Sequence, residues 1–207
     1  MSNSFSLSFK GLIIIIIFLI LFICIFFIPT NPDWSYSSVS NENLILDISS
    51  SGYVWPAPGY TRINSYFGYR TSPTAGASSY HSGLDIGAPE GSKLVAVTSG
   101  KITFAQFLGG GGYTITLTSG NMKFTYCHVS PYYIVKVGDY VIQGQLIGYV
   151  GPKNVYGVKG NQYKDENGNP TNGATTGPHL HFGLRINGEY ADPLTLFNWF
   201  LLMYPGY

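Results

Sequence analysis

The hydrophobic pattern begins with one uninterrupted apolar run. Residues 11–28 (GLIIIIIFLILFICIFFI) carry no charged side chain. As a helix this run is about 27 Å long, enough to cross the hydrocarbon core of a bilayer. Signal peptides have shorter apolar cores and a cleavage site of small residues, which the following IPTNPDW lacks. The pattern therefore predicts an uncleaved transmembrane signal anchor over residues 11–28, preceded by a short N-terminal segment, residues 1–10.

After the apolar run the pattern changes twice. Residues 29–52 are rich in Ser, Asn and Pro, which is typical of a linker. From residue 53 onward, short runs of alternating apolar and polar residues are separated by Gly and Pro, as in KLVAVTSGKITFAQF, YTITLTSGNMKFTYCHV and HLHFGLRING. Alternation of this kind is typical of half-buried β-strands. We expect an all-β, antiparallel domain over residues 53–196, followed by an apolar tail, 197–207, that is too short to span a membrane.

Two segments within this domain need separate interpretations. The glycines at 109–112 indicate a hairpin connection and not a phosphate-binding loop, because no helical pattern follows them.

Residues 151–176 form a polar insertion whose DENGNP resembles the start of an EF-hand loop, but Pro170 and Thr176 stand where that loop needs Gly and Glu. With little to build a core, the insertion is expected to be mobile. Replacing residues 153–174 by a short turn is expected to preserve folding.

Composition and charge limit the partners and orient the chain. Only 10% of the residues are charged and the net charge is +1, so nothing favours a nucleic-acid partner. Lys10 is the only charged residue before the apolar run, whereas the first charges after it, Asp33, Glu42 and Asp47, are acidic. The positive-inside rule then predicts residues 1–10 in the cytoplasm and the β domain outside.

The chain has four histidines, and their spacing suggests a metal site. His179 and His181 alternate in a predicted strand, so their side chains face the same side with Cα atoms roughly 6.6 Å apart. His81 and Asp85 would lie about 13 Å apart in an extended chain, too far to share one ion. The chain must therefore bend between them, and Gly83 is the residue that permits a bend at least cost.

The fourth histidine, His128, ends a strand. Alternation directs its neighbour Cys127 to the opposite face, which favours Cys127 as a small core residue and not as a ligand. The two cysteines are not expected to pair, since Cys24 lies in the apolar run.

A chain with three histidines and one aspartate in such short motifs could hold a tetrahedral Zn²⁺ on some of them, with an open position for water. Zinc lowers the pKa of that water to about 7, and a remaining histidine could accept its proton or stabilise the oxyanion. No HExxH or G-x-S-x-G motif is present, which excludes helical zincins and a serine nucleophile elbow. Spacing alone leaves open which of His179 and His181 binds the metal. It also leaves open that the pair is only hydrogen-bonded in a surface strand.

Five motifs occur in a fixed order: FGYR (67–70), HSGLDIGAPEGSKLVAV (81–97), YCHVS (126–130), VGDYVIQGQLIGYVG (137–151) and TGPHLHFGL (176–184). Together they resemble the lysostaphin-type (LytM-like) zinc metallopeptidases, which cleave peptide bonds in peptidoglycan. The resemblance covers about residues 53–196. It implies an antiparallel β-sandwich or barrel of the duplicated-hybrid-motif type. It also implies His81, Asp85 and His181 as zinc ligands, and His179 and His128 as the catalytic histidines.

The resemblance and the apolar run together predict a single-pass enzyme of the bacterial cell membrane, whose β domain faces the cell wall. Its partners would be the membrane and the peptidoglycan peptide. Whether an envelope protein must also bind to open the cleft is not decided by the sequence. One alternative is a scaffold that binds peptidoglycan without cutting it. Another is a biotinyl or lipoyl carrier domain, which VKVGDYVIQGQLIGYV resembles, but the second half and the exposed lysine of a carrier are missing.

Overall fold

The structure, a computed structural model, describes residues 52–72 and 78–197. The predicted cytoplasmic segment (1–10), the transmembrane helix (11–28), all but the last residue of the predicted linker, and residues 198–207 lie outside the described residues. Within the two described ranges, no helix is long and apolar enough to cross a membrane.

The described residues form β-strands and two short 3-10 turns, which confirms the prediction of an all-β domain. Every strand pairing is antiparallel. The strands are β1 (Ile63–Ser65), β2 (Gly68–Tyr69), β3 (Tyr80–His81), β4 (Gly83–Ile86), β5 (Lys93–Val95), β6 (Gly100–Phe107), β7 (Tyr113–Ser119), β8 (Met122–Cys127), β9 (Tyr140–Val141), β10 (Leu146–Tyr149), β11 (Leu180–Ile186) and β12 (Glu189–Ala191), and the turns are η1 (Gly109–Gly111) and η2 (Pro193–Leu196).

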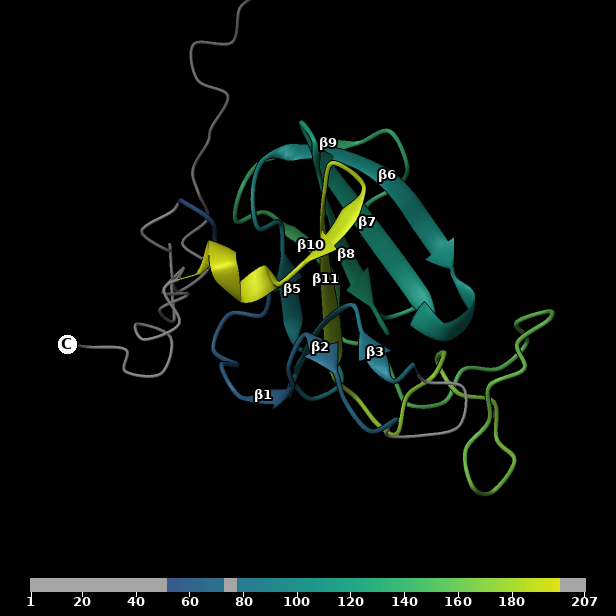
Figure 1. The fold of residues 1–207 in the computed structure, drawn as a ribbon. Coiled ribbons are helices and arrows are strands. Elements are labelled where there is room, and N and C mark those ends of the chain that lie inside the picture. The colour runs from purple at the N-terminus through teal and green to yellow at the C-terminus, as the bar shows by residue number, and fades with distance from the viewer. Residues whose placement is uncertain (1–51, 73–77, 198–207) are drawn as a thin grey trace, which may run out of the picture. The chain divides into compact units, whose positions relative to one another are not determined.

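Eight strands form one large sheet in the order β1-β4-β11-β8-β7-β6-β9, with β12 paired to β11 (Figure 1). Two further sheets have two strands each, β5 with β10 and β2 with β3. The order places β11, from the end of the chain, between β4 and β8. Three segments that are far apart in the sequence therefore meet in the centre of the large sheet, and each carries one of the histidine motifs.

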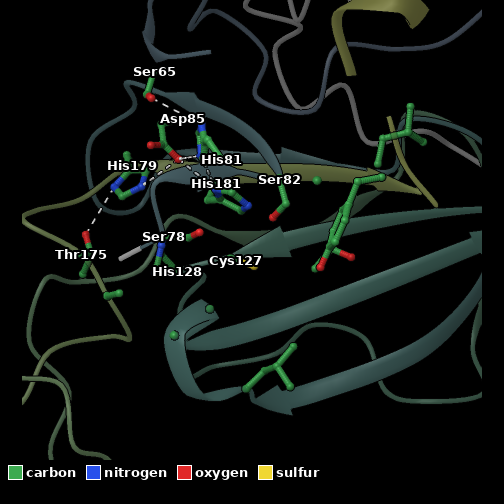
Figure 2. A pocket seen from close by; sticks show the side chains of 18 of the residues that line it. Ser65, Ser78, His81, Ser82, Asp85, Cys127, His128, Thr175, His179 and His181 are labelled. Carbon is green, nitrogen blue, oxygen red and sulfur yellow. Dashed lines mark hydrogen bonds and ion pairs between the residues drawn. The ribbon is translucent and has the colours of Figure 1, made fainter. Parts of the chain in front are cut away.

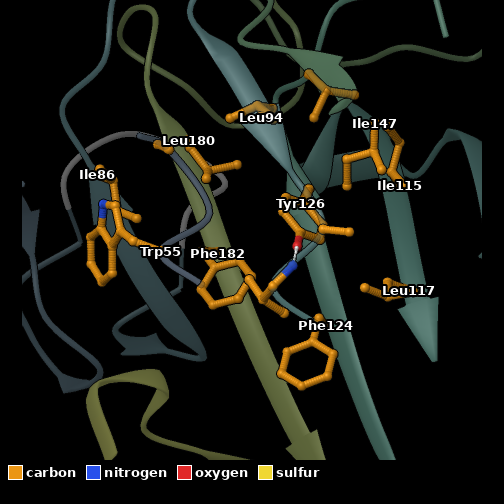
Figure 3. Close-up of a cluster of buried hydrophobic side chains, with 14 of the residues drawn as sticks. Trp55, Ile86, Leu94, Ile115, Leu117, Phe124, Tyr126, Ile147, Leu180 and Phe182 are labelled. Carbon is orange, nitrogen blue, oxygen red and sulfur yellow. Dashed lines mark hydrogen bonds between the residues drawn. The ribbon is translucent and has the colours of Figure 1, made fainter. Parts of the chain in front are cut away.

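The hydrophobic core lies on one face of the large sheet. Along β8 and β11, alternate side chains such as Phe124, Tyr126 and Phe182 are fully buried and belong to one cluster (Figure 3). The Tyr126 hydroxyl accepts from the Val97 amide and donates to the Val95 carbonyl, both at 3.0 Å, and so ties the large sheet to the end of β5. Because these residues face the core, the residues between them along each strand face the other side of the sheet.

The two ends of the domain add to this core. Phe197, the first residue of the predicted apolar tail, is 6% exposed and packs edge-on against Trp55 with ring centroids 4.9 Å apart. Trp55 lies two residues after the predicted start of the domain. The core therefore includes residues close to both predicted boundaries, 53 and 196.

The glycines at 109–112 connect β6 to β7, an antiparallel pair, as predicted for a hairpin. The connection is closely packed. Gly112 has φ +63°, and a Cβ there would clash with the backbone and side-chain oxygens of Asn172. The hairpin is thus fixed against the end of the polar insertion.

The prediction of a mobile, unpacked insertion is wrong for its base. Asn172 is completely buried and Thr171 is 1% exposed. Isolated bridges join Asn154 to Thr171 and Lys164 to Pro170, so the insertion doubles back on itself. The base of the insertion is held by hydrogen bonds from asparagine side chains and backbone groups. A scarcity of apolar side chains therefore does not make this part of the chain mobile.

Candidate metal centre

Asp85 and His181 are opposite each other on neighbouring strands. In the register of β4 and β11, His181 pairs with Asp85. Their neighbours Leu84 and Phe182 are fully buried in the core. Because side chains alternate along a strand, the carboxylate and the imidazole must both lie on the open face of the sheet.

His81 reaches the same point from β3. Only Ser82 separates β3 from β4, and His81 Nε2 lies 3.0 Å from Asp85 Oδ1. The predicted bend between His81 and Asp85 is therefore present, but Gly83 has a different role from the one predicted. It lies within β4, where a Cβ would clash with the Phe182 carbonyl oxygen and lie 2.9 Å from His181 Nε2. The absence of a side chain at Gly83 allows β11 to approach closely.

The side chains of His81, Asp85 and His181 form a group whose ligand atoms can share one metal ion (Figure 2). His181 Nδ1 lies 2.9 Å from both Asp85 Oδ1 and His81 Nε2. Metal bonds of 2.0–2.2 Å in tetrahedral geometry would place such atoms about 3.4 Å apart. The group therefore needs to open by only a few tenths of an ångström to hold an ion.

Hydrogen bonds determine which nitrogen His81 presents to the metal. Its Nδ1 lies 2.8 Å from the Tyr66 carbonyl oxygen, which can only accept, so Nδ1 carries the proton. In the neutral ring Nε2 then has a free lone pair directed at Asp85 and His181. A backbone carbonyl that fixes the tautomer of a histidine in this way is a common feature of metal ligands.

The two remaining histidines, His179 and His128, also have Nδ1 hydrogen-bonded to a backbone carbonyl. Nδ1 of His179 donates to the Gly177 carbonyl at 2.9 Å, and Nδ1 of His128 donates to the Asn172 carbonyl at 2.7 Å. Both rings therefore present Nε2 as an acceptor when neutral. Their centroids are 4.7 Å apart, and His179 Nε2 is 3.5 Å from Asp85 Oδ1. The structure thus brings all five predicted site residues to one place.

His128 reaches the cleft by an unusual backbone conformation. Tyr126 faces the core, so regular alternation would direct residue 128 there as well. Instead His128 has φ +57°, in the left-handed region, and lines the cleft. Cys127 is buried, at 6% exposure, and is not part of the group that could hold a metal, as predicted, but it lines the cleft and lies outside the main hydrophobic cluster. Burial raises the pKa of its thiol to about 12, so it is neutral at pH 7.

The charge states favour metal binding at neutral pH. Burial raises the pKa of Asp85, but the imidazoles of His179, His181 and His81 around its carboxylate favour the charged form, outweigh this effect and hold the pKa well below the usual range. Burial also lowers the pKa of His181 below its ordinary value, although the Asp85 carboxylate opposes this. Burial, with the nearby His179 and His181, lowers the pKa of His128 to about 3. At pH 7 Asp85 is therefore a carboxylate and His181 a neutral imidazole, which are the protonation states in which these side chains bind metals.

Sequence reasoning missed two residues that hold this group in place. Arg70 donates to Asp85 Oδ2 at 2.9 Å and so leaves Oδ1 facing the histidines. It is the last residue of the FGYR motif, which was the only signal for it. Asn172 accepts from the Tyr113 amide at 2.8 Å, donates to the Val129 carbonyl at 3.0 Å, and through its own carbonyl holds His128. Nothing in the sequence distinguishes it from the other asparagines of the insertion.

The group of His81, Asp85 and His181 lies in a large open cleft. The cleft has a volume of about 960 Å³ and is lined by residues of the large sheet, of the β3 segment and of the end of the insertion, including Thr175 and Thr176. Residues 174–176 thus form part of its wall. This volume is at the upper end of the range of ligand sites.

Comparison with known proteins identifies the family of the chain. Residues 79–193, more than half of the chain, match Peptidase family M23. The chain is 33% identical to the DD-carboxypeptidase/endopeptidase Mpg of Neisseria meningitidis over 138 residues, covering 66% of this chain and 27% of that protein. It is 30% identical to the peptidoglycan DD-endopeptidase ShyC of Vibrio cholerae, covering 66% and 28% respectively. The chain thus spans about a quarter of the length of these relatives.

Solved structures show the same fold. The catalytic domain of the antimicrobial peptidase lysostaphin from Staphylococcus simulans superposes with a TM-score of 0.51 at 31% identity. The match covers 66% of this chain and 90% of that domain. The region shared with this chain is therefore nearly the whole of a domain that is catalytic in the relative.

Proposed function

The chain belongs to Peptidase family M23, and on that premise we propose that it is a zinc metalloendopeptidase that hydrolyses peptide bonds in bacterial peptidoglycan. The peptidase family and the lysostaphin-like fold come from the comparisons. The identity of the metal and the substrate of this particular chain are the parts that we propose.

The proposal depends mainly on the convergence of His81, Asp85 and His181. They supply two imidazole nitrogens and one carboxylate oxygen, which is a common set for a catalytic zinc site with an open coordination position. When bound, zinc would lower the pKa of a coordinated water to about 7 and so supply a nucleophile at neutral pH.

The residues around the metal ligands suit the remaining steps. Arg70 holds the carboxylate of Asp85 in one orientation. His179 and His128 present free Nε2 atoms beside the metal ligands, since their Nδ1 protons are used in bonds to backbone carbonyls. We assign to one of these histidines the acceptance of the proton of the attacking water. The resulting imidazolium then stabilises the oxyanion of the tetrahedral intermediate.

We also propose that residues 11–28 anchor the enzyme in the bacterial cell membrane, with its β domain on the cell-wall side. The support is the uncharged apolar run, which is long enough to cross a bilayer, and the acidic residues that follow it. A membrane anchor would restrict the enzyme to the layer of peptidoglycan closest to the membrane.

The decisive experiment is turnover by the full-length protein. We expect the protein, loaded with one equivalent of zinc, to cleave purified cross-linked muropeptides into fragments that mass spectrometry can identify. The His81→Ala variant should lose both the metal and the activity. Lys93→Gln, which alters an exposed side chain of β5, is the matched control and should retain both.

A zinc-loaded protein that binds these muropeptides but cleaves none of them would support the non-cutting scaffold and reject the endopeptidase. Metal content alone cannot separate the two functions, because a scaffold could retain the ion.

A further inference from the structure

Two basic side chains face each other in the same cleft as the metal ligands. Lys123 on β8 and Arg185 on β11 are directly opposite in the antiparallel register, and both are exposed. Both also line the cleft that contains His81, Asp85 and His181. The mechanism described above uses neither of them.

Strand geometry fixes their direction and distance from the metal ligands. His181, Gly183 and Arg185 are alternate residues of β11, and all three line the cleft. The residues between them, Phe182 and Leu184, are fully buried in the core. Four residues of strand place Arg185 roughly 13 Å from His181 along the open face of the sheet.

The surface between these two points is open. Gly183 has no side chain, and the residue opposite it on β8 is Thr125. A groove of small residues thus runs along β11 from the metal ligands to the basic pair. An extended peptide placed along it would span the distance with three or four residues.

The basic pair lacks an acidic partner. Among the residues that the structure describes, neither Lys123 nor Arg185 has a carboxylate within 4.0 Å, whereas Arg70 and Lys153 do. Like charges directly opposite each other on neighbouring strands destabilise a sheet. An anion bound between them would remove this repulsion.

Arg185 is also held in a fixed position. Its guanidinium carbon lies 4.2 Å from the ring centroid of Tyr190, its partner on β12, and Nη2 donates to the Tyr190 hydroxyl. Stacking on an aromatic ring limits the rotamers of the side chain and leaves other N–H groups free. Arg185 is therefore better prepared to bind a ligand than an arginine that extends freely into solvent.

We propose that Lys123 and Arg185 form an anion subsite for a carboxylate of the peptide substrate, three or four residues away from the bond that is cleaved. This inference rests on the proposed function, because it places the scissile bond at the metal ligands. The planar fork of Arg185 matches a carboxylate with two parallel hydrogen bonds, and Lys123 adds a second positive charge. The enzyme then selects acidic peptides and discriminates against those in which the carboxylate is amidated.

The test uses a cross-linked muropeptide and the same muropeptide with its carboxylates converted to carboxamides. Dissociation constants for both are measured with the zinc-loaded, full-length protein, and turnover is followed separately. The wild-type protein should bind the carboxylate form about tenfold more tightly or better, as expected for charge-assisted hydrogen bonds. Arg185→Gln should weaken binding of the carboxylate form by a similar factor and leave binding of the amidated form unchanged.

Lys93→Gln is the matched control, since it removes one positive charge from a different sheet. The Lys93→Gln variant should keep the preference of the wild-type protein for the carboxylate form over the amidated form, whereas Lys123→Gln should reduce this preference. Arg185→Lys should retain part of the preference, because it keeps the charge and loses the fork.

Equal preference in Arg185→Gln and the wild-type protein would overturn the subsite, whether or not the muropeptides are cleaved. Absence of cleavage together with the expected binding pattern would instead reject the endopeptidase function and retain the subsite.

Discussion

The strongest structural prediction concerns Asn172, because the side chain and backbone of this one buried residue join the insertion, the β6–β7 connection and His128. Its side chain accepts from the Tyr113 amide and donates to the Val129 carbonyl. Asn172→Ala removes both bonds in a place that water does not reach, since residue 172 is completely buried. Two unsatisfied backbone groups should together cost about 2–4 kcal/mol of the free energy of unfolding. For a chain of this size such a loss lowers the Tm by roughly 5–15 °C.

The same substitution should affect catalysis without affecting the metal. The Asn172 carbonyl receives the Nδ1 proton of His128, so movement of the backbone at 172 releases that ring. We expect kcat to fall about tenfold or more, in line with the loss of a positioned proton-transfer or oxyanion group. KM should change little. The zinc content should remain at one equivalent, because the predicted ligands lie on β3, β4 and β11.

The assay combines thermal unfolding by circular dichroism, metal analysis and turnover of muropeptides by the full-length protein. Asn167→Ala is the control, since Asn167 is exposed and its bond to Asp165 is made by its backbone amide, which the substitution retains. A Tm within 1 °C of the wild-type value would refute the energetic argument. A large loss of stability with unchanged kcat would show that Asn172 supports the fold but does not position His128.

Four other outcomes are expected. Asp85→Ala should abolish zinc binding, measured by metal analysis after dialysis, because it removes one of three protein ligands. His179→Ala should keep zinc but lose activity by about 10²-fold or more, and near-normal turnover would remove it from the catalytic step. Replacing residues 156–169 by a two-residue turn removes the hydrogen bonds of Asn161 and Tyr163 to buried Thr171, so it should cost about 2–4 kcal/mol of stability. It should also alter KM or the preference among muropeptides. Unchanged kinetics would exclude that part of the insertion from substrate binding. A reporter fused after residue 52 should appear outside the cell and in the membrane fraction, whereas a shortened, soluble form would indicate cleavage.

The structure changes the experiment that the sequence suggested for the insertion. The sequence predicts that replacement of residues 153–174 preserves folding, but this range includes Asn172. The larger deletion should therefore destabilise the protein, while the smaller one retains the bridge between Asn154 and Thr171. The comparison of the two deletions separates the supporting part of the insertion from its outer part.

The sequence by itself predicted the class of fold and five of the residues that the structure brings together at the site. Alternation of apolar and polar residues with period two is a local property, so it predicts strands without knowledge of their neighbours. Histidine spacing likewise limited the chemistry, since His81, Asp85 and the pair His179 and His181 could reach one ion only in a few arrangements. The motif order then indicated the family.

The tertiary structure decided what depends on contacts between distant segments. Only the placement of β11 between β4 and β8 shows that His181 lies opposite Asp85 and that Arg185 lies opposite Lys123. The nitrogen that each histidine presents follows from carbonyl groups of Tyr66, Asn172 and Gly177, none of which a side-chain pattern can reveal. The left-handed backbone at His128 contradicted alternation for the same reason: its energy cost is met by packing against the hairpin and the insertion, which are remote in the sequence.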